Sequence, residues 1–309
     1  MKIAIVGAGW LGCHLAYKLK NSHDITLYDK SSIFAETSYK NQNRLHLGYH
    51  YARNHDTRKM CQLTFDKFVD DYYHLTQEID KNIYAVPKDK SLIDFKTYIK
   101  IFDDYDYDWD SHPDLLDIEG AIRVQERYID PFLSKTFFEK ELQSVLKIEN
   151  VTEAMLGEMK ESFDLIINCT NNMLNSIQKD IFYESCKVYV YRKLGRTEFD
   201  ALTLVDGDLW SIFPYKNDLY TVTHVKYTPN TTDQKFARHK MEIEIVKNYP
   251  NFMEDFVYDH SFFSTKVKYK NQSATRIPII RHNGKVIDCF TGKIQGMYVL
   301  EDYVRKLCE

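Results

Sequence analysis

The spacing of apolar and polar residues predicts four elements within the first 30 positions. Residues 2–6, KIAIV, are apolar and rich in β-branched side chains, which is the pattern of a buried strand. Apolar residues then recur at helical spacing between Leu11 and Leu19, and a second strand-like run, DITLYD, ends at Asp29. The sequence GAGWLG lies between the first strand and the helix. The pattern therefore predicts a strand, a glycine-rich turn, a helix and a second strand, in that order.

The middle of the chain alternates between helical and strand patterns. Residues 56–79 have the apolar spacing of a long amphipathic helix, and residues 82–87, NIYAVP, form a short apolar run typical of a strand. A helix is predicted over residues 91–102, and residues 119–142 have the pattern of a strand, a turn and a helix. A further buried strand is predicted over residues 163–168.

A different pattern covers residues 186–228. Aromatic, β-branched and polar residues alternate there, and turn sequences stand at Asp206-Gly207 and at residues 216–218. This alternation predicts an antiparallel sheet, followed by a helix over residues 232–249. The chain therefore combines an α/β part with a mainly antiparallel β part.

Composition and charge narrow the class of protein. The 309 residues are 44% hydrophobic, which is enough for one large domain or two ordinary ones. A formal net charge of −4 gives no reason to expect a nucleic acid or an anionic membrane as partner. The six cysteines are scattered without a C-x-x-C motif, so we expect no metal site and no disulfide framework. No signal peptide or bilayer-spanning run is apparent, so we expect a cytoplasmic monomer or homodimer that acts on a small molecule.

The glycine-rich turn carries the first functional prediction. Gly7, Gly9 and Gly12 have the G-x-G-x-x-G spacing: the first permits a tight turn, the second lets a pyrophosphate approach the backbone, and the third lets the helix lie close to the sheet. The helix N-terminus offers free N–H groups and a positive dipole end to phosphates. Asp29 is placed to accept hydrogen bonds from ribose hydroxyls, and an acid there disfavours NADP. We therefore predict a site for an adenine dinucleotide, NAD or FAD.

The segment after Asp29 distinguishes between these two dinucleotides. An NAD-binding enzyme would continue with further strand–helix units, whereas residues 31–54 are irregular and polar. Within this segment, NQNRLHLGYHY places Arg44, His46 and His50 close together, which is unusual for either a solvated loop or a core strand. The missing strand–helix units therefore disfavour an NAD-binding enzyme and leave FAD as the alternative.

The order of these pieces resembles the FAD-dependent oxidoreductases of the D-amino-acid-oxidase type, which include sarcosine and glycine oxidases. GAGWLG with Asp29 is similar to the dinucleotide-binding unit of that family. TSYKNQNRLHLG resembles its segment that runs from the pyrophosphate to the flavin ring, and DLIINCT resembles its strand that ends at a threonine. ATRIP resembles its segment beside the substrate, and TGKIQGMYVLEDYV resembles its closing loop and helix under the flavin.

The resemblance implies a two-domain α/β fold with FAD as the cofactor. A Rossmann-like FAD-binding domain would comprise residues 1–80, 125–175 and 270–309. An inserted, mostly antiparallel β substrate domain would comprise residues 81–124 and 176–269.

The resemblance also implies which residues meet FAD and the substrate. The expected cofactor-binding residues are Gly7, Ala8, Gly9, Trp10, Leu11, Gly12, Asp29, Lys30, Ser38, Asn43, Arg44, Leu45, Thr170, Gly292, Lys293 and Ile294. The expected catalytic residues are His46, His50 and Arg276, and the expected substrate-binding residues are Tyr49, Trp210, Tyr215 and Arg276. Structural roles are open for several of them: core packing for the aromatic residues, an ion pair for Arg276 and a solvated turn for Lys293.

Three functions are open at this stage. The first is hydride transfer to FAD from a small amine, hydroxy acid or sugar-derived compound, and an arginine beside the substrate implies an anionic group on it. The second is a redox-neutral flavoenzyme that resembles UDP-galactopyranose mutase and acts on a nucleotide sugar. The third is a nucleotide-bound scaffold or sensor without catalysis. The segment rich in arginine and histidine favours an enzyme, and the lack of G-x-S-x-G, H-E-x-x-H and P-loop motifs disfavours a hydrolase or kinase.

Overall fold

The computed structural model describes residues 1–112, 114–174, 181–195, 197–270 and 275–309. Residues 113, 176–180 and 196 of the expected substrate domain therefore lie outside the described residues. So do residues 175 and 271–274 of the expected FAD-binding domain, which include Ala274 of the ATRIP motif. The chain forms two units: unit 1 comprises Met1–Tyr39, Pro131–Tyr183 and Val267–Glu309, and unit 2 comprises Lys40–Asp130 and Glu184–Lys266. No helix among the described residues is long and apolar enough to cross a bilayer.

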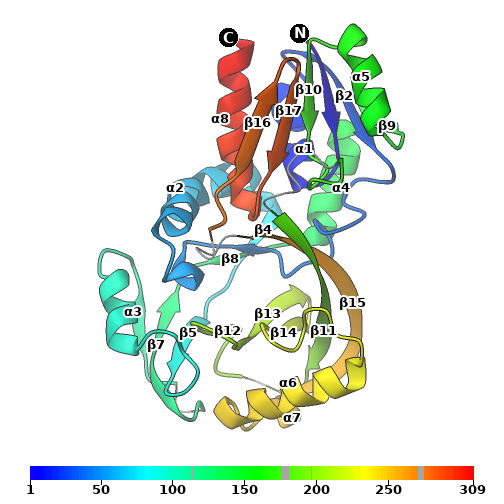
Figure 1. Cartoon of the computed structure of the whole chain (residues 1–309). Coiled ribbons are helices and arrows are strands. Elements are labelled where there is room, and N and C mark those ends of the chain that lie inside the picture. The colour runs from blue at the N-terminus through cyan, green and yellow to red at the C-terminus, as the bar shows by residue number, and fades with distance from the viewer. Residues whose placement is uncertain (113, 175–180, 196, 271–274) are drawn as a thin grey trace. The chain divides into compact units, whose positions relative to one another are not determined.

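Unit 1 contains a six-stranded sheet with helices packed on it (Figure 1). The predicted order at the N-terminus is confirmed: β1 (Lys2–Val6), α1 (Trp10–Leu19) and β2 (Asp24–Asp29) follow one another. The strand order is β16-β17-β10-β1-β2-β9, parallel except for the antiparallel β16–β17 pair. The remaining elements of this unit are α4 (Pro131–Leu142), β9 (Leu146–Ile148), α5 (Glu153–Ser162), β10 (Leu165–Asn168), β16 (Ile279–Asn283), β17 (Val286–Phe290), a 3₁₀ turn η4 (Ile294–Gly296) and α8 (Met297–Cys308).

Unit 2 is built on an eight-stranded sheet of order β15-β11-β14-β13-β12-β5-β7-β6. The predicted antiparallel sheet over residues 186–228 is confirmed, because β11 pairs with β14, β14 with β13 and β13 with β12, all antiparallel. β12 also pairs with β5, and this pair is parallel. The strands are β5 (Asn82–Pro87), β6 (Asp108–Asp110), β7 (Ile118–Val124), β11 (Ile181–Lys193), β12 (Ala201–Leu204), β13 (Trp210–Lys216), β14 (Leu219–His224) and β15 (Phe256–Tyr269).

A second, three-stranded sheet in unit 2 corrects one prediction. The sequence predicts a single helix over residues 56–79, but the helix ends at Tyr72, because residues 76–78 form a strand that hydrogen-bonds to β8. This sheet has the order β3-β8-β4, with β3 (Arg44–Leu45), β4 (Thr76–Glu78) and β8 (Arg127–Ile129). The remaining elements of unit 2 are η1 (Tyr49–Tyr51), α2 (His55–Tyr72), η2 (Tyr73–Leu75), α3 (Phe95–Ile101), α6 (Gln234–Asn248) and α7 (Phe252–Asp255).

The same sheet explains why the unit boundaries differ from the expected domain boundaries. Residues 40–80 and 125–130 were expected with the glycine-rich turn, yet they belong to unit 2. Their strands β3, β4 and β8 pair only with one another among the described residues, so the segment after residue 39 is held within unit 2.

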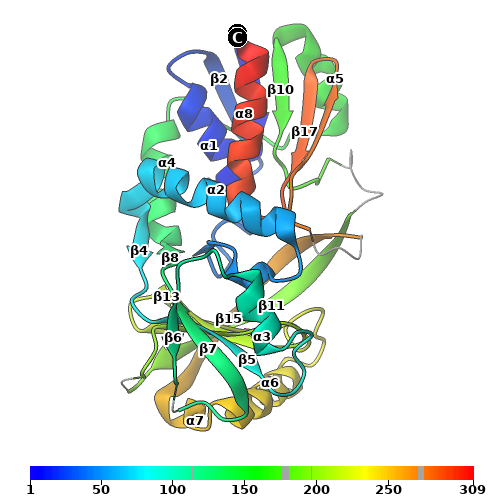
Figure 2. The same cartoon turned by 90° about the vertical axis from the view of Figure 1, so that its left-hand side faces the viewer.

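The two faces of the large sheet differ in chemistry. Leu202, Ile212 and Val222 are register neighbours on one face, and they join a buried apolar cluster with Met241 and Ile245 of α6. α6 lies along this face (Figure 2). The residues one position along, Thr203, Ser211 and Thr223, are also register neighbours and point to the opposite face, because side chains alternate along a strand. A row of hydroxyl groups therefore crosses the face that α6 does not cover.

Candidate functional site

The glycine-rich turn of unit 1 leaves no room for side chains at two of its glycines. Gly7 has a φ of +107°, and its N–H donates to the carbonyl oxygen of Tyr28 at 2.7 Å. A Cβ on Gly7 would lie 2.7 Å from the carbonyl oxygen of Cys169, at the end of β10. A Cβ on Gly12 would lie 1.9 Å from the carbonyl oxygen of Gly7. These contacts hold α1 directly against the ends of β1 and β10.

Two polar side chains come to the same turn from later in the sequence. The N–H of Ala8 donates to Asp29 Oδ2 at 2.7 Å, and the N–H of Trp10 donates to Ser38 Oγ at 3.0 Å. Gly9 is the N-cap of α1 and gives no side-chain cap, and a Cβ there would lie 2.8 Å from Ser38 Oγ. The first turn of a helix has N–H groups without intrahelical partners. The arrangement therefore suits an anionic group of a ligand at the start of α1.

Trp10, Asp29, Lys30 and Leu11, which were also expected to bind the cofactor, differ in burial and in hydrogen-bond partners. The ring of Trp10 is buried against Phe34 and Phe138, so this residue faces the turn through its backbone. Asp29 Oδ1 accepts hydrogen bonds from the N–H and the hydroxyl of Ser31, at 2.9 and 3.2 Å, and Lys30 is exposed. Leu11 is half-buried, which is typical of a first-turn position.

Thr170 lies beside the glycine-rich turn, as the strand order requires. A Cβ on Gly7 would be 3.0 Å from the N–H nitrogen of Thr170. The N–H and the hydroxyl of Thr170 both donate to Asn168 Oδ1, at 3.1 and 2.7 Å. Asn168 Nδ2 donates in turn to Asp288 Oδ1 at 2.8 Å, so this carboxylate of β17 fixes the end of β10.

Two segments that were predicted separately as parts of the site, ATRIP and TGKIQG, contact each other in unit 1. A Cβ on Gly292 would lie 2.7 Å from Cδ of Arg276, so the ATRIP and TGKIQG segments are in contact. Arg276 Nη1 donates to the carbonyl oxygen of Thr275 at 2.9 Å. The N–H of Lys293 donates to Thr291 Oγ1 at 3.2 Å, and the Thr291 hydroxyl donates to the carbonyl oxygen of Lys293 at 2.6 Å. Ile294 then starts η4, which leads into α8.

Tyr269, which was not among the expected site residues, lies next to these two segments. Its ring would be 3.4 Å from a Cβ on Gly292, and its hydroxyl donates to the carbonyl oxygen of Ile277. Burial raises the pKa of its phenol well above the ordinary value, while Arg276 acts in the opposite direction. It is the last residue of β15 and is buried, as an aromatic core residue would be.

Arg44 is buried in unit 2, on the hydroxyl-bearing face of the large sheet. Its Nη1 donates to Thr203 Oγ1 at 2.8 Å, and its Cζ lies 4.2 Å from the centre of the Phe213 ring. Its Nε and Nη2 are buried and have no hydrogen-bond partner within the described part of the chain. Burial lowers the pKa of this guanidinium, and Tyr84 and Glu126 nearby oppose that effect. A buried cation with two open donors is the feature of this face that most clearly calls for a partner.

Gln42 adds polar groups to the same face. Its Nε2 donates to Thr221 Oγ1 at 3.2 Å, and its Oε1 accepts a hydrogen bond from the hydroxyl of Thr223 at 3.3 Å. The neighbouring Asn43 is buried with a φ of +50°, and its Nδ2 donates to the carbonyl oxygen of Asn41 at 3.1 Å. Leu45 is fully buried and pairs with Arg127 of β8. The segment is thus fixed to the sheet at several points.

His46 belongs to a buried polar cluster that the sequence revealed only in part. Its Nδ1 lies 3.4 Å from Glu126 Oε2 and 3.4 Å from the hydroxyl oxygen of Tyr84. Its ring stacks on His50, with centroids 5.6 Å apart. Glu126 and Tyr84 were not predicted, because each appears in the sequence as one residue of a strand pattern. Nothing in the local sequence distinguishes Glu126 from the other charged residues of the strands beside it, such as Arg123 of β7 and Arg127 of β8.

Three aromatic residues expected to bind substrate have structural contacts. Tyr49 is in a buried cluster with Phe102 and Tyr84, and its hydroxyl donates to the carbonyl oxygen of Asp106. Trp210 is buried in the cluster on the α6 face, opposite to the hydroxyl row. Tyr215 is buried against the ring of Phe262. Core packing explains the position of all three.

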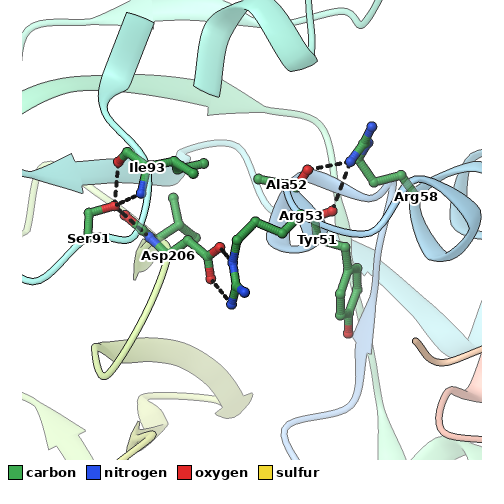
Figure 3. A network of polar contacts seen from close by, with 8 residues as sticks. Tyr51, Ala52, Arg53, Arg58, Ser91, Ile93 and Asp206 are labelled. Atoms are coloured by element: carbon green, nitrogen blue, oxygen red, sulfur yellow. Dashed lines mark hydrogen bonds and ion pairs between the residues drawn. The ribbon is translucent and has the colours of Figure 1, made fainter. Parts of the chain in front are cut away.

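A hydrogen-bond network anchors the chain just after the His46–His50 segment (Figure 3). Arg53 donates to both carboxylate oxygens of Asp206, and the N–H of Asp206 donates to Ser91 Oγ at 3.1 Å. The Ser91 hydroxyl donates to the carbonyl oxygen of Ile93 at 2.6 Å. Arg58 Nη1 donates to the carbonyl oxygens of Tyr51 and Ala52. The segment is therefore held at both ends, by β3 before it and by this network after it.

Comparison with known proteins finds similarity to FAD-dependent oxidoreductases. Residues 2–121 match the family model described as FAD dependent oxidoreductase (DAO). A protein named FAD-dependent monooxygenase FPY4, from Fusarium mangiferae, is 28% identical over 99% of this chain and 91% of its own length.

Solved structures share the fold. Glycine oxidase from Geobacillus kaustophilus has a TM-score of 0.73 at 10% identity, over 99% of this chain and 94% of that one. L-alpha-glycerophosphate oxidase from Mycoplasma pneumoniae, solved with FAD bound, has a TM-score of 0.68 at 16% identity, over all of this chain and 94% of that one. The expected α/β fold with an inserted, mostly antiparallel domain is thereby confirmed. Together with the matched family model and the Fusarium relative, these findings indicate an enzyme that uses FAD and is similar to the DAO-type FAD-dependent oxidoreductases.

Proposed function

We propose that the enzyme oxidises a small anionic molecule, namely an amine, a hydroxy acid or a sugar-derived compound, by removing a hydride from one of its carbon atoms. FAD supplies the electron-accepting chemistry when it is bound, and the protein binds it, orients the substrate and sets the local charge. The FAD-dependent family and the polar face of unit 2 support this proposal.

The residues proposed to hold FAD fit the group. The turn from Gly7 to Gly12 would receive the pyrophosphate, because these glycines leave the backbone open and α1 begins there without a side-chain cap. Asp29, which already contacts the turn through Ala8, would accept hydrogen bonds from the ribose. Ser38 lies against Gly9 and would border the phosphates. Lys293 would place a positive charge at the flavin, which stabilises the reduced anion.

The observation that carries the substrate proposal is the buried guanidinium of Arg44. Its two open donors, Nε and Nη2, have the fork geometry that suits a carboxylate or phosphate. The hydroxyls of Thr203 and Ser211 lie on the same face and would meet other polar groups of a small substrate. Arg276, in unit 1, is proposed as a second cationic group for the substrate or the cofactor.

A spectrum and a reduction assay test this proposal. Purified protein should show the two visible absorption bands of oxidised flavin. Anaerobic mixing with a panel of amino acids, hydroxy acids, sugar acids and their uncharged analogues should bleach those bands with the anionic members only. Equal bleaching by the uncharged analogues would contradict the anionic class, and a protein that no member of the panel reduces would contradict the proposed oxidation of small molecules.

A second candidate function comes from the name of one relative. The Fusarium protein, 28% identical over nearly the whole chain, is named a monooxygenase. A monooxygenase puts one oxygen atom of O₂ into its product, whereas an oxidase releases both as hydrogen peroxide. Turnover under ¹⁸O₂, followed by mass spectrometry of the product, distinguishes the two. The redox-neutral alternative on a nucleotide sugar has no support in these comparisons, and we do not propose it.

A further inference from the structure

A cavity of about 400 Å³, here called the β14 pocket, lies in unit 2 at the end of β14 and beside α6. Its polar lining residues come from the loop after β5, the loop after β12, the end of β14 and α6: Lys90, Asp208, His224, Lys226, Tyr227 and Glu244. All of them belong to the same unit.

The β14 pocket is on the face of the large sheet opposite to Arg44. Trp210 and His224 are register neighbours, and Trp210 is buried in the apolar cluster on the α6 face. Ser211 and Thr223, the next residues along, belong to the hydroxyl row of the other face, because side chains alternate along a strand. The sheet therefore separates this pocket from the proposed substrate site.

His224 presents an N–H group to the pocket. The side chain is buried, and its Nδ1 accepts a hydrogen bond from the N–H of Lys226 at 3.1 Å. Burial lowers the pKa of this imidazole to about 4, so near pH 7 the ring is neutral and carries its hydrogen on Nε2. Nε2 has no hydrogen-bond partner within the described part of the chain, yet it is not sealed from solvent, as both ring nitrogens of His112 are. A buried side chain therefore directs an unused donor into the pocket.

The charged groups around this donor have an excess of cations. After burial, the pKa of His224 responds to four charged neighbours: Glu244, Lys90, Asp208 and Lys226. Glu244 accepts hydrogen bonds from two ammonium groups, those of Lys90 and Lys247. The ammonium of Lys226 has no ion pair or hydrogen bond among the described residues. Three ammonium groups thus stand against two carboxylates, and one negative charge would balance the set.

We propose that the β14 pocket binds a small oxyanion, a carboxylate or a phosphate, between Nε2–H of His224 and the ammonium of Lys226. The imidazole supplies a donor whose orientation is fixed by the backbone, and the lysine supplies the opposite charge. The oxygens of such an anion accept hydrogen bonds from both groups. Leu92 and the ring of Tyr227 also line the pocket and offer apolar contact to the rest of the ligand. This inference does not rest on the proposed oxidation.

Histidine nitrogen spectra of the holoenzyme locate the anion. Protein labelled with ¹⁵N at histidine is titrated at pH 7.5 with sodium acetate, with inorganic phosphate and with acetamide, while sodium chloride holds the ionic strength constant. The His224 signals are assigned from a His224→Asn sample. We expect hydrogen on Nε2 before the titration and a saturable shift of the His224 signals with acetate, phosphate or both. Acetamide has the shape of acetate without its charge and should not cause the shift.

The arms of this titration separate the two sources of the anionic group. A shift with acetate alone identifies a carboxylate ligand, and a shift with phosphate alone identifies a phosphate ligand. His239, at an exposed position of α6, is the internal control, and its signals should not shift saturably. Hydrogen on Nδ1 of His224, no saturable shift with either anion, an equal shift with acetamide or the same shift at His239 would overturn the proposal.

Substitution of the two donors tests the site further. Isothermal titration calorimetry measures the dissociation constant of the anion that shifts the His224 signals. His224→Asn removes the Nε2 donor and should weaken binding roughly 10- to 150-fold. Lys226→Gln removes an exposed charge and should weaken binding about 2- to 5-fold. Lys235→Gln, which removes the same charge at an exposed position of α6, is the matched control and should bind like the wild type.

The exposed position of Lys226 keeps the calorimetry decisive even if His224→Asn fails to fold. An unchanged dissociation constant in Lys226→Gln would overturn the assignment of the site. Flavin reduction has no part in these measurements. Failure of the anion to bind would therefore leave the proposed oxidation intact, and an enzyme that no compound reduces could still bind the anion in this pocket.

Discussion

Gly9 and Ser38 meet at the N-terminus of α1, where a Cβ on Gly9 would lie 2.8 Å from the Ser38 hydroxyl oxygen. That oxygen also accepts a hydrogen bond from the N–H of Trp10, at 3.0 Å. The serine is 29 positions away in sequence, yet it borders the turn that is proposed to receive the pyrophosphate. Any side chain at position 9 would therefore occupy space that both Ser38 and a phosphate need.

We expect Gly9→Val to yield folded protein without yellow colour. The valine side chain would displace Ser38 and block the approach of a phosphate to the backbone. FAD content is measured by absorbance after heat release, and folding by circular dichroism. Gly157→Val is the control, because a Cβ on Gly157 of α5 meets nothing within 4 Å, and this variant should retain FAD. Normal FAD content in Gly9→Val would remove the turn from the cofactor site.

The local parts of the fold were predictable from the sequence, and the reason is physical. The strand, glycine-rich turn, helix and second strand follow from periodicity and from glycine conformations, which depend on neighbouring residues. The end of α2 at Tyr72 was not predictable in this way, because residues 76–78 leave the helix to pair with β8, about 50 positions later. Long-range pairing overrides a helical pattern without leaving a mark in the local sequence.

The candidate site, like the fold, could be predicted from the sequence only where local residues determine it. Arg44 and His46 stood out because charged and ring residues crowd into one short segment. Glu126 did not, because its importance comes from Leu47, Tyr84 and Asn82, which lie 79, 42 and 44 positions away. Trp210 and Ser211 are adjacent, and only the register of β13 decides that the serine joins the hydroxyl row while the tryptophan enters the core.

The Arg44→Lys variant should still bind the flavin but should bind the substrate more weakly. Lysine keeps the positive charge but lacks the planar guanidinium. In Arg44 this guanidinium contacts Thr203 through Nη1 and has two further donors, Nε and Nη2, for a ligand. A lost hydrogen bond to a charged group costs about 1.5–3 kcal/mol, so the half-saturating concentration of the reductant should rise roughly 10- to 150-fold. Anaerobic stopped-flow at the flavin band measures it. Arg123→Lys, at an exposed arginine paired with Asp108, is the control. An unchanged concentration dependence would show that Arg44 is purely structural.

Arg276→Ala should also stay yellow and lose substrate-driven reduction. Removing one partner of a buried charged contact costs about 2–5 kcal/mol, or roughly 30- to 5000-fold. The rate and the half-saturating concentration of flavin reduction are compared with those of the wild type. Arg281→Ala, at an exposed position of β16 five residues later, is the control and should behave as the wild type. If Arg276→Ala matches the wild type in both quantities, this arginine has no role in substrate binding.

His224 makes the folded protein sensitive to acid. It is buried at the end of β14, it borders a pocket of about 400 Å³, and its Nδ1 accepts a hydrogen bond from the N–H of Lys226 at 3.1 Å. Burial lowers its pKa from 6.5 to about 4. The folded state therefore binds fewer protons than the unfolded state between these values. Its contribution to stability is complete above pH 6.5 and is lost as the pH falls toward 4.

Replacing His224 with asparagine should reduce the loss of stability at acid pH. In His224→Asn, the side-chain oxygen can accept a hydrogen bond from the N–H two residues later without titrating. The full shift corresponds to about 3 kcal/mol, and because the adjoining pocket admits solvent we expect about 1–2 kcal/mol. The free energy of unfolding in urea is measured at pH 7 and pH 4.5. Between pH 7 and pH 4.5, the free energy of unfolding should fall by about 1–2 kcal/mol more in the wild type than in His224→Asn. His239→Asn, at an exposed position of α6, is the control and should lose as much stability as the wild type. Equal losses in all three proteins would show that His224 is not the group that titrates.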